Sequence, residues 1–277
     1  MSIRRALLGA LAFVFSTFAA KAIEPVDLEL VLAVDISGSI DEDEARLQRQ
    51  CYVAALTDPE VLKAIRSGLH GRIAILYFEW SGPETRRLVL DWTVIEDEAS
   101  AKAAASALAA AAIRSGMSTS ISGAIEFAMP MYGRAYAGAR RVLDISGDGP
   151  NNAGSFILGP REAALARGIT INGLPIINDR PSRGGFPVMK DLDLYFEHCV
   201  IGGPGAFLVV AENFDAFAAA IRKKMIVEIA DLSPPLPPSQ QALESGPIRR
   251  VANGYPPGCD IGERMSREYF QRRFQSP

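Results

Sequence analysis

Oxygen-bearing side chains alternate along a short segment that directly follows a run of apolar residues. Asp35, Ser37 and Ser39 place one carboxylate and two hydroxyls at every second position. Oxygen ligands of this kind suit a hard divalent cation such as Mg²⁺, which prefers an octahedral oxygen shell and keeps several of its waters. The motif alone is a weak indication, because Asp, Ser and Gly are also frequent in turns and helix caps.

Two later segments supply further oxygen ligands. Asp148 ends an apolar run in Ile145–Gly149, and Ser118 and Thr119 lie in a loop that leads into a helix. Ligands in open parallel sheets bind beyond the carboxyl ends of the strands, so we expect Asp148 to lie near Asp35. The loop leaves open which of its two adjacent hydroxyls, that of Ser118 or that of Thr119, is the ligand.

The elements that must position these residues alternate between strand and helix patterns. Apolar runs predict strands over residues 26–35, 72–80, 88–95, 141–146, 169–177 and 206–210. Helical spacing and caps predict helices after residue 41, over 98–114, 120–132, 158–167 and 188–196, and after 214. This order predicts an α/β fold with a mostly parallel sheet and helices on both faces. A hairpin turn at residues 81–84 predicts one antiparallel edge strand.

Together, the three oxygen-bearing segments resemble the von Willebrand factor type A (vWA) domain and its metal-ion-dependent adhesion site (MIDAS). The resemblance covers about residues 27–228 and implies a Rossmann-like vWA fold. The motif matches are, in chain order, Asp35, Ser37, Ser39, Thr119 and Asp148.

The resemblance also implies how a metal is held. In the family, the two serines and the threonine contact Mg²⁺ or Mn²⁺ directly or nearly so, whereas the acids often act through water. A cation with few direct anionic ligands keeps an open coordination position, which an acidic side chain of a partner protein can fill. The implied function is non-enzymatic, metal-dependent binding of a protein.

Two further phrases resemble an uncharacterised family of exported bacterial vWA-like proteins, a domain of unknown function. They are Arg140–Asn152 and Cys199–Phe207. This closer resemblance implies location and architecture and supplies no activity.

The N-terminus has the pattern of a secretory signal peptide. Arg4 and Arg5 precede the uncharged stretch 6–20, and Ala22 completes a small-residue cleavage site. We therefore expect residues 1–22 to be removed and the protein to be periplasmic or extracellular. The chain has no second apolar run of spanning length, so no stable membrane insertion is expected after cleavage.

The rest of the chain is expected to divide into a vWA-like domain over 23–230 and a proline-rich extension over 231–277. Residues 262–274 can form a short helix that docks on the domain. Cys199 and Cys259 both lie beside Gly/Pro-rich turns, and a disulfide between them would fix this extension. Cys51 is predicted to be a buried small hydrophobe.

The net charge argues against a nucleic-acid-binding protein. A charge of −3 offers no surplus of basic residues to neutralise phosphates.

Two alternative functions stay open beside the metal-dependent binding module. One is a metal-independent scaffold with a degenerate site. The other alternative is a Ser-His-Asp hydrolase, which needs a histidine near the nucleophilic serine. This alternative is less favoured, because His70 precedes a strand and His198 follows a helix, so both are expected to lie away from the serines.

Polar residues outside the motif are interpreted either as structural residues or as candidates for partner contact. Asp144, inside a central strand, is predicted to be a buried acid paired with an arginine or with backbone donors. Arg222–Lys224 is interpreted as the solvent face of the last helix. Asn151, Asn152 and the loop Asp179–Gly185 are candidates for partner contact at the rim of the sheet.

Overall fold

The computed structural model describes residues 23–177, 186–213, 216–230, 248–250 and 257–274. The predicted signal peptide 1–22, the loop 179–185 and the proline-rich stretch 231–247 lie outside the described residues. Among the described residues, no helix is both long enough and apolar enough to cross a bilayer.

A seven-stranded sheet forms the centre of the molecule, in the order β3-β2-β1-β4-β5-β6-β7. The strands are β1 (Glu24–Asp35), β2 (Ile73–Trp80), β3 (Arg86–Ile95), β4 (Tyr136–Gly147), β5 (Thr170–Pro175), β6 (Phe207–Val209) and β7 (Ile248–Arg250). Strands β2, β1, β4, β5 and β6 run parallel to one another, and β3 pairs antiparallel with β2. The predicted α/β fold with an antiparallel edge is confirmed.

The C-terminal segment adds a second antiparallel edge strand, β7, beside β6. We predicted an extended proline-rich chain at this position. A three-residue strand is too short to show the alternation that identifies strands in a sequence.

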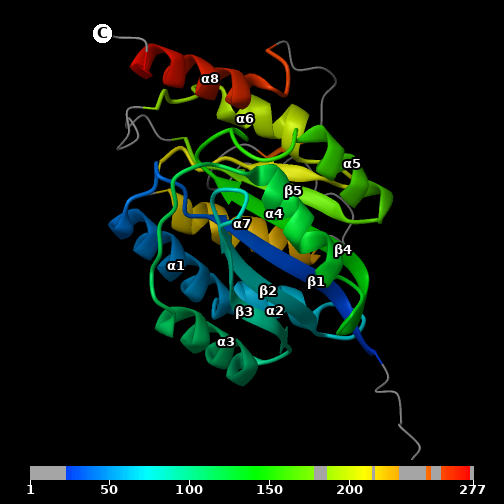
Figure 1. The fold of residues 1–277 in the computed structure, drawn as a ribbon. Helices are drawn as coiled ribbons and strands as arrows, with labels where there is room; N and C mark the ends of the chain where they lie inside the picture. Colours follow the sequence, from blue (N-terminus) through cyan, green and yellow to red (C-terminus); the bar gives the residue numbers. More distant parts are fainter. Residues whose placement is uncertain (1–22, 178–185, 214–215, 231–247, 251–256, 275–277) are drawn as a thin grey trace, which may run out of the picture.

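Helices cover both faces of the sheet (Figure 1). The helices α1 (Glu42–Leu56), α2 (Pro59–Arg66), α3 (Glu98–Ala110) and α7 (Phe217–Ala230) pack on one face. On the other face lie α4 (Ile121–Ala128), α5 (Leu158–Ala166), α6 (Leu192–Tyr195) and the π-helix η2 (Phe196–Val200). A 3₁₀ turn, η1 (Met129–Met131), follows α4. The last helix, α8 (Ile261–Phe274), lies beside α6.

Strand β1 is largely apolar because both of its faces are buried. Successive side chains of a strand point to opposite faces, so a strand buried on both sides is apolar throughout. Leu30 and Leu32 join the core under α1 and α7, whereas Val31 and Ala33 join the core under α4 and α5. This central position brings the end of β1, at Asp35, to the carboxyl edge of the sheet.

Two helix starts show what local sequence does and does not reveal. The predicted capping box of α1 is confirmed, with the Asp41 side chain accepting from the N–H of Glu44 and the Glu44 side chain accepting from that of Asp41. Helix α2 was not predicted. Its signal is the pair Asp58-Pro59, in which Asp58 accepts from the N–H of Glu60 at 2.8 Å.

The disulfide between Cys199 and Cys259 is present, with a Cα–Cα distance of 5.5 Å, and Cys51 is buried as predicted. The bridge joins η2 to the turn before α8. The helix predicted over 262–274 is confirmed as α8, which directly follows this turn.

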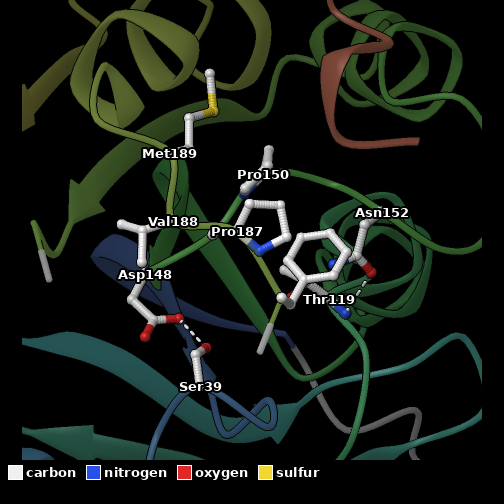
Figure 2. Close-up of a pocket in the computed structure, with 10 residues that line it drawn as sticks. Ser39, Thr119, Asp148, Pro150, Asn152, Pro187, Val188 and Met189 are labelled. Carbon is white, nitrogen blue, oxygen red and sulfur yellow. Dashed lines mark hydrogen bonds between the residues drawn. The ribbon is translucent and has the colours of Figure 1, made fainter. Parts of the chain in front are cut away.

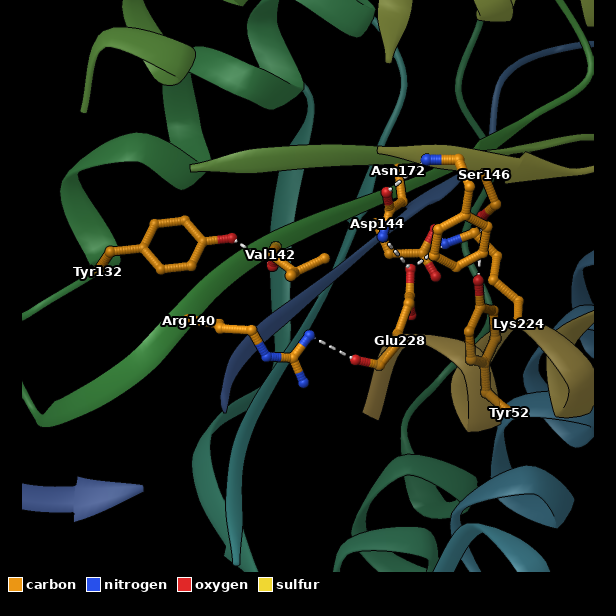
Figure 3. Close-up of polar contacts among 10 residues, drawn as sticks. Tyr52, Tyr132, Arg140, Val142, Asp144, Ser146, Asn172, Lys224 and Glu228 are labelled. Atoms are coloured by element: carbon orange, nitrogen blue, oxygen red, sulfur yellow. Dashed lines mark hydrogen bonds and ion pairs between the residues drawn. The ribbon is translucent and has the colours of Figure 1, made fainter. Parts of the chain in front are cut away.

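One expectation about charge is wrong. Lys224 is not on the solvent face of α7, because its side chain is only 1% exposed. Its Nζ lies 2.7 Å from Asp144 Oδ1 and also pairs with Glu228 (Figure 3). Asp144 is a buried acid as predicted, but its partner is this lysine rather than an arginine.

Candidate metal and partner-binding site

The two predicted acids meet at the carboxyl edge of neighbouring strands. Strands β1 and β4 are parallel and in register, with Val34 opposite Ser146. The next residue of β4, Gly147, lies so close to Asp35 that a Cβ on the glycine would be 2.9 Å from Asp35 Oδ2. A side chain at position 147 would therefore compete with the carboxylate for this space, and Asp148 follows directly.

Hydrogen bonds link four of the five predicted site residues into a chain. Asp35 Oδ1 accepts from the N–H of Ser37 at 2.7 Å. The hydroxyls of Ser37 and Ser39 lie 3.3 Å apart, and Ser39 Oγ donates to Asp148 Oδ1 at 2.5 Å. The Asp-x-Ser-x-Ser segment thus ends at Asp148, the residue that directly follows β4.

Thr119, the fifth residue, reaches the same place from the loop before α4. It lines a pocket of about 40 Å³ together with Ser39 and Asp148 (Figure 2). Ser118 does not line this pocket. Its hydroxyl lies against Gly82, where a Cβ would be 2.6 Å from Ser118 Oγ.

Asn152 holds the Thr119 backbone from both sides. Asn152 Oδ1 accepts from the Thr119 N–H at 2.9 Å, and the Asn152 N–H donates to the Thr119 carbonyl at 2.9 Å (Figure 2). Our sequence analysis missed this role. Asparagine in a loop is common for turn reasons alone, so its spacing carries no signal of a long-range contact.

The electrostatics of the site favour a cation. Burial raises the pKa of Asp35 well above its ordinary value, and the negative charge of Asp148 raises it further. Asp35 Oδ2 is buried and has no hydrogen-bond partner among the described residues. A positive ion between the acids would offset both the burial and the repulsion.

The donor set consists of hydroxyl and carboxylate oxygens, which fit Mg²⁺ or Mn²⁺. Across the part of the chain that the structure describes, no group of three or more His, Cys, Asp or Glu side chains is placed to hold a metal. Any cation at this edge would therefore depend on the hydroxyls as well as on the two acids.

The remaining rim residues divide into core and surface. Asn151 is fully buried, so its interpretation as a partner contact is wrong. Glu79, at the end of β2, is also buried and pairs with Arg49 and Arg87. Met117 is 96% exposed in the loop that carries Thr119.

An apolar wall forms the other side of the pocket, and our sequence analysis did not find it. Its residues are Phe186, Pro187, Val188 and Met189. Val188 and Met189 were expected in a helix over 188–196, but α6 begins only at Leu192, so residues 186–189 form a loop that the fold brings to the site.

Histidines lie elsewhere. His70 precedes β2, at the opposite edge of the sheet, where its N–H donates to Asp27. His198 lies in η2, next to the disulfide-bonded Cys199.

Solved structures share this fold at low sequence identity. The pilus adhesin SpaC from Lactobacillus rhamnosus GG matches at 14% identity with a TM-score of 0.55, covering 76% of this chain and 31% of the adhesin. Proximal thread matrix protein 1 (PTMP1) from the mussel byssus matches at 14% identity and 0.52, covering 76% of this chain and 49% of PTMP1. This chain therefore spans half or less of each of these proteins.

A second structure of PTMP1, described as having a zinc-occupied MIDAS motif, matches at 14% identity with a TM-score of 0.50, covering 75% of this chain and 49% of PTMP1. The expected vWA-like fold is confirmed, and at these identities the likeness concerns the fold alone. No curated protein sequence matches the chain. A family model described as "Protein of unknown function (DUF1194)" matches residues 25–233.

Proposed function

The chain belongs to the DUF1194 family, whose function is unknown, and we propose that it is a non-enzymatic, exported module that binds a protein partner through a metal-dependent site. The observation that carries the proposal is the shared pocket of Ser39, Thr119 and Asp148, to which Ser37 and Asp35 are hydrogen-bonded. Three segments far apart in the chain thus bring five oxygen-bearing side chains to one edge of the sheet.

In this proposal, the hydroxyls of Ser37, Ser39 and Thr119 hold Mg²⁺ or Mn²⁺ directly, and Asp35 and Asp148 act mainly through water. The bound cation supplies an electropositive position with room for one outside ligand. An Asp or Glu side chain of the partner is the fitting ligand, because a carboxylate oxygen matches a hard cation. The pocket geometry favours Thr119 over Ser118 as the loop ligand.

Two findings support an exported binding role over catalysis. The structures that share the fold include one protein named as a pilus adhesin and one named as a thread matrix protein of the mussel byssus. The Cys199–Cys259 disulfide is typical of proteins outside the reducing cytosol, in agreement with the predicted signal peptide.

Calorimetric titration of the protein with MgCl₂ tests the metal site. Asp35→Ala and Asp148→Ala should each abolish measurable Mg²⁺ binding, because each removes a carboxylate from the site. Asp91→Ala, an exposed acid on β3, is the matched control and should bind Mg²⁺ like the wild type. Equal affinity in all four proteins would refute the site.

Affinity capture tests the partner. Immobilised protein should retain a partner in buffer with Mg²⁺ and release it when EDTA is added. Met117→Ser, which alters an exposed side chain beside the site, should weaken capture without changing Mg²⁺ affinity. Capture that is insensitive to EDTA would favour the metal-independent scaffold instead.

A further inference from the structure

The C-terminal helix α8 lies against the loop that completes the site. A Cβ on Gly262, in the first turn of α8, would be only 2.0 Å from the carbonyl oxygen of Asn151. Backbone contact this close is possible only because position 262 is glycine. The disulfide at Cys259, three residues earlier, ties the start of the helix to η2.

A side-chain contact continues this link into the site. Glu263 Oε1 accepts from Asn151 Nδ2 at 2.7 Å. Asn151 Oδ1 in turn accepts from the N–H of Ser122 at 2.9 Å, in the first turn of α4. The first N–H groups of a helix have no partner within it, so Asn151 satisfies one of them and fixes the helix start. Thr119 is three residues before Ser122.

The same helix also contacts the apolar wall of the pocket. The rings of Tyr269 and Phe186 lie 5.5 Å apart. Helix α8 therefore supports the pocket from two directions, one through Asn151 and one through Phe186. The family match ends at residue 233, so it assigns no role to this helix.

We propose that α8 is an integral part of the binding site and that Glu263 is a positioning residue that sets metal affinity through Asn151 and the start of α4. This inference rests on the proposed metal site. Asn151 Nδ2 donates to Glu263 Oε1 and also to the Ser155 carbonyl at 3.1 Å, so these two acceptors together fix the amide orientation and leave Oδ1 for Ser122.

Two measurements on the full chain test the proposal, namely Mg²⁺ titration by calorimetry and hydrogen exchange of the backbone amides of residues 119–123. Glu263→Ala should weaken Mg²⁺ binding severalfold, less than the roughly tenfold loss typical of a residue that bonds a metal ligand directly, because Glu263 acts through Asn151 and the Ser122 N–H, and it should speed exchange at Ser122. Glu263→Gln keeps an acceptor for Asn151 Nδ2 and should restore most of both. Glu268→Ala, an exposed position of the same helix, is the control and should change neither.

The possible results separate this inference from the proposed function. Wild-type Mg²⁺ affinity and wild-type exchange in E263A would overturn the positioning role while leaving the metal site intact. If the wild type binds no Mg²⁺, the proposed function fails, and exchange at Ser122 alone decides whether α8 positions the loop. Gly262→Ala forces the helix away from Asn151 and should reproduce the effect of E263A, which guards against a folding defect confined to one variant.

Discussion

At the scale of single residues, two adjacent hydroxyls in one loop have different surroundings. The Thr119 backbone is held at its N–H and its carbonyl by Asn152, and the residue faces the pocket beside Ser39. The hydroxyl of Ser118 instead lies against Gly82. Residues that hydrogen-bond to a metal ligand fix its orientation. Asn152 provides such contacts for Thr119 beside the pocket, so Thr119 is the better placed of the two hydroxyl residues.

Paired substitutions in this loop should therefore have unequal effects. Thr119→Ala should lower Mg²⁺ affinity by about tenfold or more, because it removes a ligand whose backbone is already fixed. Ser118→Ala should leave the affinity unchanged, and it serves as the matched hydroxyl control. Calorimetric titration of both variants provides the measurement. The reverse ranking would assign the loop ligand to Ser118.

The predictability of the site follows from what each residue contacts. Asp35, Ser37 and Ser39 could be identified because they alternate directly after a buried strand, and Asp148 because it ends another. The choice between Ser118 and Thr119 depends on how one loop turns, which spacing does not encode. Asn151 looks like a rim residue in the sequence and is buried in the fold, because α8 covers it from a distant part of the chain.

At the scale of elements, α7 is joined to the sheet by buried charge. Lys224 and Glu228 of α7 meet Asp144 of β4, and Asn172 of β5 donates to Glu228 Oε1 at 3.1 Å (Figure 3). One ammonium faces two carboxylates, so a fully ionised cluster carries an excess negative charge away from water. Burial of an unpaired charge is costly, so the lysine is essential to this packing.

The spacing of residues along α7 indicates that Lys224 lies on the buried face of the helix, although a lysine is usually expected to be exposed. Phe217, Ile221, Lys224 and Glu228 are spaced by four, three and four residues, so all of them lie on one face of α7. We interpreted Lys224 as solvent-exposed because it ends the charged run Arg222–Lys224, which is typical of the solvent face of an amphipathic helix. Its partner Asp144 was already expected to be buried, and pairing the two would have placed the helix face correctly.

Removal of this lysine should be strongly destabilising. Lys224→Ala should lower the free energy of unfolding by about 3–5 kcal/mol, because two buried carboxylates lose their counter-charge. Lys102→Ala breaks an exposed ion pair with Glu98 and should leave the free energy of unfolding nearly unchanged, because water screens this pair. Urea unfolding followed by circular dichroism compares the two. A similar small loss in both would mean that the cluster adds nothing to stability.

The same cluster should make stability depend on pH. Burial, and next the charge of Asp144, raise the pKa of Glu228 from 4.5 to about 7, while Lys224 and Asn172 lower it in part. Burial also raises the pKa of Asp144. Between about pH 4.5 and 7, the folded protein therefore holds more protons than the unfolded chain, and stability should fall as pH rises through this window.

Glu228→Gln should flatten this dependence, because the amide does not titrate. Urea unfolding at several pH values between 4.5 and 7 measures the slope for each protein. Glu84→Gln, at a side chain that is 96% exposed, is the control and should keep the wild-type slope. An unchanged slope in E228Q would show that Glu228 does not bind the proton.

At the scale of the whole molecule, the C-terminal segment belongs to the same structure as the vWA-like domain. Strand β7 extends the sheet. Helix α8 lies beside α6 (Figure 1), and its Gly262 and Glu263 contact Asn151. The parallel sheet was predictable because its strands contain apolar runs that alternate with helices over most of the chain. The return of the C-terminal segment was only partly predictable, through the Cys199–Cys259 pair, because β7 and the α8 contacts depend on residues far away in the chain.

The disulfide should therefore contribute to the stability of the whole molecule. It links positions 60 residues apart, so closing that loop restricts the unfolded chain. Cys199→Ala/Cys259→Ala should lower the free energy of unfolding by about 2–4 kcal/mol in urea. Wild-type protein treated with dithiothreitol should lose a similar amount, whereas the double variant should be insensitive to the reductant.

Cys51→Ala separates the bridge from thiol effects in general, since Cys51 is a free cysteine on the buried face of α1. This variant should keep the full difference between oxidised and reduced protein. The comparison bears on location as well, because a chain that needs its bridge is most stable in an oxidising compartment. Equal unfolding curves with and without reductant would remove the stability argument for export and leave only the predicted signal peptide to support it.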